Sequence, residues 1–284
     1  MAFSPKKMFL DTHCRPTLSI GQAIILGIIQ GITEYLPVSS GAHLLLMEKW
    51  MVPGACQLTF DAFNGFLQLG SVWVILLFYR RRIGRICAGL VGRSPEGLRL
   101  FFNLLCAFIP TALTGHFFGS GIRACCENLK FIASTLAIGG IYIFALVHFC
   151  HARRQLIALS WKQSFFIGVL QGIALFPGVS RSLMTISAGL WVGLPMAEAV
   201  EFSFLLGAGT IGAAITHQFF FKGISLEAGL HSIIGWGIIS ASIASVVAIR
   251  LFIKRFSMGL LFAFACYRIA LAFFIFGWHP AVDA

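Results

Sequence analysis

Charged side chains are scarce in this sequence. Of its 284 residues only 11% are charged, whereas 58% are hydrophobic, and the mean hydropathy is +0.89. A soluble domain carries about 25% charged residues. Because the shortage extends over the whole length, no soluble domain can be separated from the rest. The composition predicts a single integral membrane domain over 1–284.

Recognisable cysteine motifs are also missing. The eight cysteines form no CxxC pair, so no metal-thiolate or disulfide framework is indicated. Most lie in apolar stretches, which predicts small core residues. The 21 Lys and Arg outnumber the 10 Asp and Glu, but cytoplasmic loops of membrane proteins collect basic residues. We therefore expect no nucleic-acid partner.

Long apolar runs are what the sequence has in quantity. A spanning helix needs about 20 largely apolar residues. The runs are continuous rather than alternating, which excludes a closed β-barrel. The prediction is an all-α, polytopic membrane protein with six transmembrane helices, at 58–79, 99–118, 131–150, 196–220, 229–250 and 257–277.

Two further apolar segments are interrupted. Residues 18–36 and 161–176 are followed by Pro37 and Pro177, by polar residues and then by a second short apolar piece. Proline breaks a helix. Non-helical backbone at membrane depth survives only when it is buried in protein or lines a wet cavity. We therefore predict two re-entrant helix pairs.

The two interrupted segments also match each other at an offset of 141 residues, which divides the chain into repeat halves of about 18–150 and 161–277. Broken helices at corresponding positions of a repeat indicate a midplane binding site. The matches pair Gln22, Gly27, Gln30, Gly31, Ile32, Val38 and Ser39 with Gln163, Gly168, Gln171, Gly172, Ile173, Val179 and Ser180.

Basic residues predict the orientation. They gather in an expected loop at 80–98, before the second pair and around 250–255. With six full spans these regions share one side, which the positive-inside rule makes cytoplasmic. Both termini are then outside and the two pairs enter from opposite sides, as an inverted repeat requires.

The first break supplies Gln30, Glu34, Ser39, Ser40 and His43. Gln30 and Glu34 are four residues apart and share one helix face. A carboxylate inside the membrane is costly and usually faces a partner or a cavity. A serine with a nearby histidine and glutamate is the inventory for nucleophilic attack.

The second break supplies Ser180, Arg181, Ser182 and Thr185. Hydroxyls, free amides at a helix start and one guanidinium are typical of an anion site. Arginine binds phosphate bidentately and stays charged when buried. Together the two breaks predict a nucleophile and a base facing a phosphate cradle.

Three other residues are weaker candidates. Gln68 could face the cavity or form a hydrogen bond across helices. Glu201 lies near the start of the span at 196, where acidic residues suit a helix N-terminus. Arg268 lies inside the last span and needs an anion or a carbonyl as a partner, which could be Glu201 or substrate.

The sequence resembles the undecaprenyl-diphosphate phosphatase family, also known for bacitracin resistance. The resemblance extends over essentially the whole chain and is most specific at QGITEYLPVSSGAH, PGVSRSLMT and VEFSFLL. It implies a bacterial inner-membrane hydrolase that converts undecaprenyl diphosphate to undecaprenyl phosphate and phosphate, which recycles the lipid carrier for peptidoglycan. It also implies a divalent metal, Mg²⁺ or Ca²⁺, a polyprenyl diphosphate substrate drawn from membrane lipid and a periplasmic active site. A homodimer is left open.

The resemblance assigns roles to matched residues. Ser40 falls on the nucleophile, His43 on the motif histidine, and Glu34 with Gln30 on the acidic-or-glutamine motif that could hold metal. The phosphate ligands fall on Ser180, Arg181, Ser182 and Thr185, with Ser39 beside Ser40, and Glu201 matches the acidic residue before FSFLL.

The sequence departs from the family pattern at several positions. Gln30 replaces a common glutamate and removes a possible metal ligand. Leu183 replaces a usual glycine, and we expect it to crowd the backbone beside the phosphate. Gly209 stands where many members have proline. Every reactive group is kept, so activity is expected.

Two questions stay open at this stage. Ser40 attacks phosphorus with help from His43, or His43 is the nucleophile and Ser40 a phosphate ligand. The rival class is an inverted-repeat transporter or flippase for an anionic or lipid-phosphate substrate. A carrier needs charge complementarity but no nucleophile beside a base, which favours the enzyme.

Overall fold

A computed structural model describes residues 18–52, 57–126, 128–149, 159–222, 230–252 and 257–278. Every regular element within these ranges is an α-helix, which confirms the predicted all-α class. The helices are α1 (Ile20–Thr33), α2 (Ser40–Met51), α3 (Gln57–Phe78), α4 (Arg80–Leu90), α5 (Pro95–Cys126), α6 (Leu129–Phe149), α7 (Trp161–Ile173), α8 (Arg181–Trp191), α9 (Met196–Lys222), α10 (Leu230–Phe252) and α11 (Met258–Gly277).

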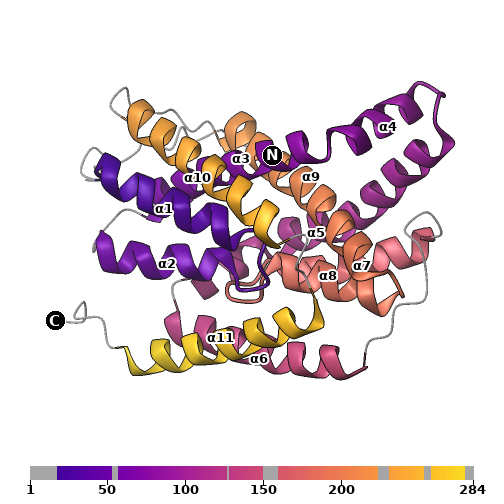
Figure 1. The fold of residues 1–284 in the computed structure, drawn as a ribbon. Helices are drawn as coiled ribbons and strands as arrows, with labels where there is room; N and C mark the ends of the chain where they lie inside the picture. The colour runs from indigo at the N-terminus through magenta and orange to yellow at the C-terminus, as the bar shows by residue number, and fades with distance from the viewer. Residues whose placement is uncertain are drawn as a thin grey trace, which may run out of the picture.

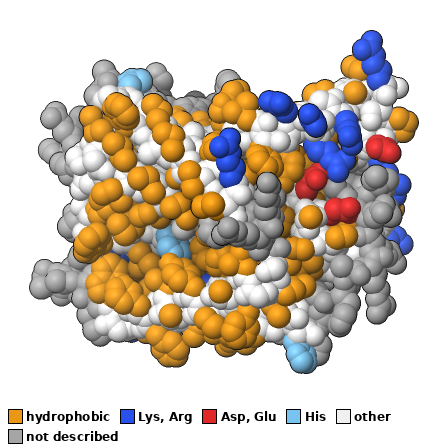
Figure 2. Space-filling model, viewed as in Figure 1, with side chains coloured by type: hydrophobic (Ala, Val, Ile, Leu, Met, Phe, Trp, Pro, Cys, Tyr) orange, Lys and Arg blue, Asp and Glu red, His pale blue; other side chains and the backbone are white. Residues whose placement is uncertain are grey.

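Five helices, namely α5, α6, α9, α10 and α11, are long and apolar enough to cross a membrane. The sixth expected span corresponds to α3, of which Phe63–Phe78 is a shorter apolar helix. Hydrophobic side chains are spread over much of the face shown in Figure 2, while most of the visible Lys and Arg side chains gather at its upper right. The chain is a multi-pass membrane protein.

Both interrupted segments form helix pairs, α1–α2 and α7–α8, and the two pairs are built in the same way. The Ser19 hydroxyl caps α1, and Gln22 Nε2 donates to the carbonyl of Met51, 3.0 Å away at the end of α2. Ser160 caps α7, and Gln163 Nε2 donates to the carbonyl of Val192, 3.3 Å away beyond the end of α8. The repeat in the sequence is therefore a repeat of structure.

The two halves of the chain are interleaved. Helix α1 packs along α10, α7 packs along α5, and α6 lies beside α11 (Figure 1). Glycines allow the close approach, because a Cβ at Gly27 would overlap the carbonyl of Gly237, and one at Gly168 would overlap the carbonyl of Ala107. The loops that join α1 to α2 and α7 to α8 meet near the centre of the molecule (Figure 1).

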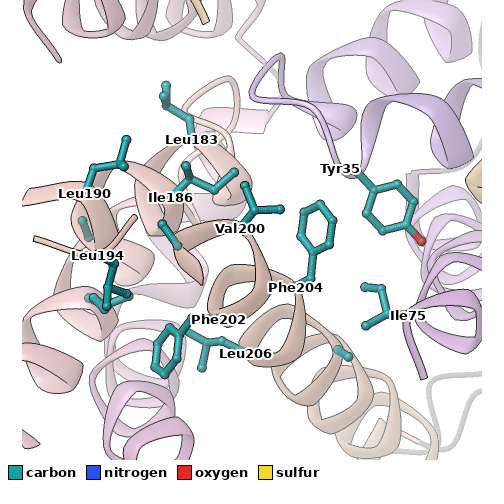
Figure 3. Packing of buried hydrophobic residues seen from close by; sticks show 14 of the residues in the cluster. Tyr35, Ile75, Leu183, Ile186, Leu190, Leu194, Val200, Phe202, Phe204 and Leu206 are labelled. Carbon is teal, nitrogen blue, oxygen red and sulfur yellow. The ribbon is translucent and has the colours of Figure 1, made fainter. Parts of the chain in front are cut away.

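The largest hydrophobic cluster lies around α8 and α9, and Figure 3 shows part of it. Leu183 belongs to this cluster and is only 1% exposed, with Ile186 and Val200 among its members. The expectation that Leu183 crowds the phosphate backbone is therefore wrong. Its place in the first turn of α8 directs its side chain into the core.

Two other expectations are corrected. The segment 80–98 is not a loop, because α4 and the first turn of α5 occupy most of it. Arginine is a good helix former, so the low hydropathy that hid this helix did not oppose it. The five described cysteines are exposed or half-buried rather than core residues. Cys87 is exposed on the arginine-rich helix α4, whereas Cys126 packs at the edge of a small hydrophobic cluster.

Candidate active site

A cavity of about 320 Å³ lies where the two breaks meet. It is lined from α1–α2, α7–α8, α5, α3 and α9, so both halves of the chain contribute. Its lining contains Glu34, Ser39, Ser40, Gly41, Gln68, Thr111, Gln171, Gly178, Ser180, Arg181, Ser182 and Thr210, with eight further mainly apolar residues.

Ser39 and Ser180 have the same unusual backbone conformation. Their φ angles are 73° and 80°, and they are the two positive-φ residues other than glycine in the described ranges. Such values are uncommon outside glycine and concentrate at functional sites. Each serine immediately precedes a helix, and this conformation points the N-termini of α2 and α8 toward the cavity.

The N-terminus of α2 is open to a ligand. Ser39 makes no side-chain capping hydrogen bond, and Gly41 lines the cavity in the first turn. By contrast, the Ser180 hydroxyl caps α8 by accepting from the Leu183 amide. Uncapped amides at a helix start bind anions. The α2 terminus therefore supplies donors on the same side as the Ser40 hydroxyl.

Glu34 is the hub of the polar contacts. Its Oε2 accepts hydrogen bonds from Gln30 Nε2 and from Ser40 Oγ, both at 2.8 Å. Its Oε1 forms a salt bridge with Arg181 Nη2. The Glu34 side chain is 5% exposed, so this carboxylate is stabilised by protein donors rather than by bulk water.

Arg181 opens α8 and carries the positive charge of the site. Its guanidinium lies against Gly207 of α9, where any Cβ would overlap Nη1. The Arg181 side chain is 21% exposed, more than that of Glu34. It therefore pairs with Glu34 while a part of the guanidinium remains available to a ligand in the cavity.

The predicted phosphate ligands occupy different places. Ser39, Ser180 and Ser182 line the cavity, but Thr185 does not. Ser182 Oγ also donates to the Leu36 carbonyl at 2.7 Å and so ties the second break to the first. Thr185 is fully buried and donates to the Arg181 carbonyl, which holds the first turn of α8.

His43 does not line the cavity. Its Nδ1 lies 2.8 Å from the Ser39 carbonyl oxygen, which can only accept, so Nδ1 carries the proton. Its Nε2 lies 2.6 Å from the Tyr267 hydroxyl, and the two rings are stacked. Both ring nitrogens are therefore occupied by partners other than Ser40. No sequence signal identified Tyr267.

Arg268 is completely buried and binds carbonyls rather than Glu201. It donates to Pro37 in the first break and to Gly178 and Val179 in the second. Its other acceptors are the carbonyls of Leu136 and Thr135 on α6. Arg268 therefore clamps the two breaks together.

Of the remaining candidates, one lines the cavity and one does not. Gln68 lines the cavity, whereas Glu201 lies outside it and forms a salt bridge with Arg82. Three polar cavity residues, Thr111, Gln171 and Thr210, were not candidates from the sequence. Gln171 Nε2 donates to Thr111 Oγ1 at 2.7 Å. Gln171 is the repeat partner of Gln30, and that match was the available signal.

A divalent cation would find few protein ligands. Among the described residues no three His, Cys, Asp or Glu side chains are grouped to hold a metal. Glu34 supplies one carboxylate, and the buried Gln30 Oε1 has no hydrogen-bond partner. Mg²⁺ commonly binds one or two carboxylates and takes its other ligands from substrate phosphates and water. Glu34 lines the cavity and fits that mode. Gln30 is fully buried and outside the lining, so its free Oε1 would be an additional ligand beside Glu34 and not part of an all-protein cage.

Comparisons with known proteins agree on one family. The family described as Bacitracin resistance protein BacA matches residues 23–274. Undecaprenyl-diphosphatase 1 of Chromobacterium violaceum is 34% identical over 92% of this chain and 97% of its own. Undecaprenyl-diphosphatase 2 of Rhodospirillum rubrum is 34% identical over 88% and 91%. The undecaprenyl-diphosphatase of Pseudomonas syringae pv. tomato is 32% identical over 90% and 95%. With this coverage and identity, the chain belongs to the bacitracin resistance protein BacA family.

Proposed function

We propose that this protein hydrolyses undecaprenyl diphosphate to undecaprenyl phosphate and phosphate, and so recycles the lipid carrier of cell-wall synthesis and confers bacitracin resistance. One observation carries the proposal. A serine hydroxyl, a carboxylate and a guanidinium from two separate breaks converge on one cavity inside a membrane protein. The names of the relatives support the same reaction.

The first step is attack of Ser40 Oγ on the terminal phosphorus. The Ser40 O–P bond forms, the bond from that phosphorus to the bridging oxygen breaks, and undecaprenyl phosphate leaves. A water molecule then cleaves the phosphoserine and releases phosphate. Glu34 takes the serine proton, because its Oε2 lies 2.8 Å from Ser40 Oγ. A base must lie within hydrogen-bond reach of the proton it removes.

His43 has a positioning role in this scheme. It holds the Ser39 carbonyl and, through it, the left-handed backbone that orients the start of α2. The alternative, in which His43 is the nucleophile, requires its ring to leave Tyr267 and turn into the cavity. The contacts therefore favour Ser40 as the nucleophile.

Neutralisation of charge supplies most of the catalysis in phosphoryl transfer. Arg181 and the amides of α2 face the phosphoryl group, with Ser180 and Ser182 beside them. As the reaction proceeds, Arg181 binds the transferring group in place of part of its contact with Glu34. That exchange frees the carboxylate to accept the proton.

Glu34 and the free Oε1 of Gln30 would hold Mg²⁺ or Ca²⁺ when substrate is present. Such a cation, once bound, neutralises the diphosphate and stabilises charge on its oxygens. We place the enzyme in the bacterial inner membrane. By the positive-inside rule the basic corner over α4 and α5 (Figure 2) is cytoplasmic. The family resemblance leads us to propose that the active site opens to the periplasm.

The test is phosphate release from a long-chain prenyl diphosphate by purified protein, with and without a chelator. Mass spectrometry of protein quenched during turnover would locate a phosphate on Ser40. Folded wild-type protein that releases no phosphate with any divalent metal would contradict the enzyme and favour a carrier. Full turnover by Ser40→Ala would contradict the serine mechanism alone.

A further inference from the structure

A second cavity lies in the hairpin formed by α4 and α5. Its volume is about 180 Å³ and it shares no lining residue with the first cavity. Three guanidinium groups line it against one carboxylate, so its wall carries a net positive charge. The lining consists of Arg82, Arg85, Pro95, Glu96, Gly97, Arg99, Leu100 and Asn103.

The backbone around this cavity is closely packed. A Cβ at Gly89 of α4 would overlap the Leu98 amide of α5, and a Cβ at Gly97 would overlap the Arg85 carbonyl. The two helices can approach this closely only because glycine occupies both positions. The cavity walls are therefore set by the hairpin itself and do not require a ligand to form.

The three arginines differ in how many of their hydrogen-bond donors remain unused. Arg82 uses Nε in its salt bridge with Glu201. Arg99 uses one Nη2 hydrogen bond, at 3.3 Å to the Leu159 carbonyl. Within the described residues Arg85 has no hydrogen-bond or salt-bridge partner, and its side chain is exposed. Arg85 and the remaining donors of Arg99 can therefore bind an external anion bidentately.

Exposed apolar residues adjoin this basic cavity. Leu90 and Val91 at the end of α4 are 54% and 68% exposed, and Phe102 and Leu105 on α5 are 56% and 42% exposed. Figure 2 shows hydrophobic side chains directly beside the Lys and Arg cluster at this corner. A basic pocket bordered by apolar surface is the arrangement that binds a lipid headgroup at a membrane surface.

We propose that this cavity binds the phosphate of an anionic phospholipid, with its acyl chains against the apolar surface of α5. Free phosphate offers the same charge, but it would make no contact with the adjoining apolar surface. A zwitterionic lipid carries an ammonium group that the three arginines oppose. The site does not depend on the proposed hydrolysis, since no cavity residue is shared.

Native mass spectrometry of the purified, delipidated full chain tests this site. Phosphatidylglycerol and phosphatidylcholine with identical acyl chains are titrated separately. We expect phosphatidylglycerol to bind at least about tenfold more tightly. The Arg85→Gln/Arg99→Gln variant should weaken phosphatidylglycerol about thirtyfold, the effect of two arginines near an anionic lipid. The charge-preserving Arg85→Lys/Arg99→Lys variant should keep most of the affinity.

The matched control is Arg80→Gln/Arg81→Gln, which removes the same charge from α4 outside the cavity. Its loss of affinity should be clearly smaller than that of the cavity variant, because neither side chain lines the cavity. Equal losses in the two glutamine variants, or equal affinity for the two lipids, would overturn the proposal. Displacement of phosphatidylglycerol by millimolar inorganic phosphate would also overturn it, because it would indicate a site for free phosphate.

Discussion

Ser40 donates its hydroxyl hydrogen bond to Glu34, at 2.8 Å, and not to His43, the histidine three residues along the same helix. The carboxylate that receives this bond also pairs with Arg181 of the second break. Nucleophile, base and phosphate ligand are therefore linked through one side chain. This relationship decides which variants should be most damaging.

The first prediction concerns Glu34→Gln. The variant keeps the size of the side chain but removes the proton acceptor, so kcat should fall by about 10²- to 10⁴-fold, the usual contribution of a general base. Steady-state phosphate release measures the change. His43→Asn should cost less, because an amide can still donate to the Ser39 carbonyl. A larger loss in His43→Asn than in Glu34→Gln would return the base role to the histidine.

The second prediction tests Arg181 without altering it. In Gly207→Ala the new methyl group overlaps Arg181 Nη1 and must displace the guanidinium. We expect kcat/KM to fall by about 10²-fold, as for a misplaced catalytic group. Gly209→Ala is the matched control, since a Cβ at Gly209 meets nothing within 4 Å. Equal activity of the two variants would show that the position of Arg181 is unimportant.

The third prediction concerns Arg268, which holds the two breaks together. Arg268→Lys keeps a positive charge but offers fewer donors to carbonyls in both breaks and on α6. Each buried acceptor left unsatisfied costs about 1–3 kcal/mol, so the thermal midpoint in detergent should fall clearly. Arg250→Lys, at an exposed position near the end of α10, should leave the midpoint unchanged. An unaltered midpoint in Arg268→Lys would refute the clamp.

The fourth prediction concerns the metal. Gln30→Glu places a second carboxylate beside Glu34, so half-maximal activity should require about tenfold less Mg²⁺. Metal titration after chelator treatment provides the measurement, and Gln171→Glu, at the repeat-related position, is the control. If chelator has no effect on the wild-type protein, metal plays no part at this site.

The two breaks could be predicted from the sequence, because proline and clustered polar residues interrupt otherwise apolar runs. Packing of apolar helices does not require such residues. The proximity of Glu34, Ser40 and Arg181 could also be predicted, because the broken helices of an internal repeat lie together at one site. The partner of His43 was not foreseen, since Tyr267 is 224 positions away and nothing in its own neighbourhood marks it.

The directions in which side chains point could not be predicted from the sequence either. Leu183 lies two residues from Arg181, and the resulting rotation of about 200° around α8 directs its side chain into the core. Arg268 was expected to meet an acidic group, and carbonyls freed by the two breaks satisfy it instead. Helix α4 was not predicted because helices were identified only by long apolar runs. Its arginine-rich sequence forms a helix although it contains no such run.

The interleaved packing of the halves has a consequence for biosynthesis. Helix α1 begins at Ile20, but the helix it packs along begins at Leu230. At about 5–20 residues per second, the first pair waits some ten to forty seconds for that partner. During this interval Glu34 is in the nascent chain before Arg181 has been made. Until Arg181 is made, Glu34 has no salt-bridge partner, so its carboxylate must be protonated or stay in contact with water.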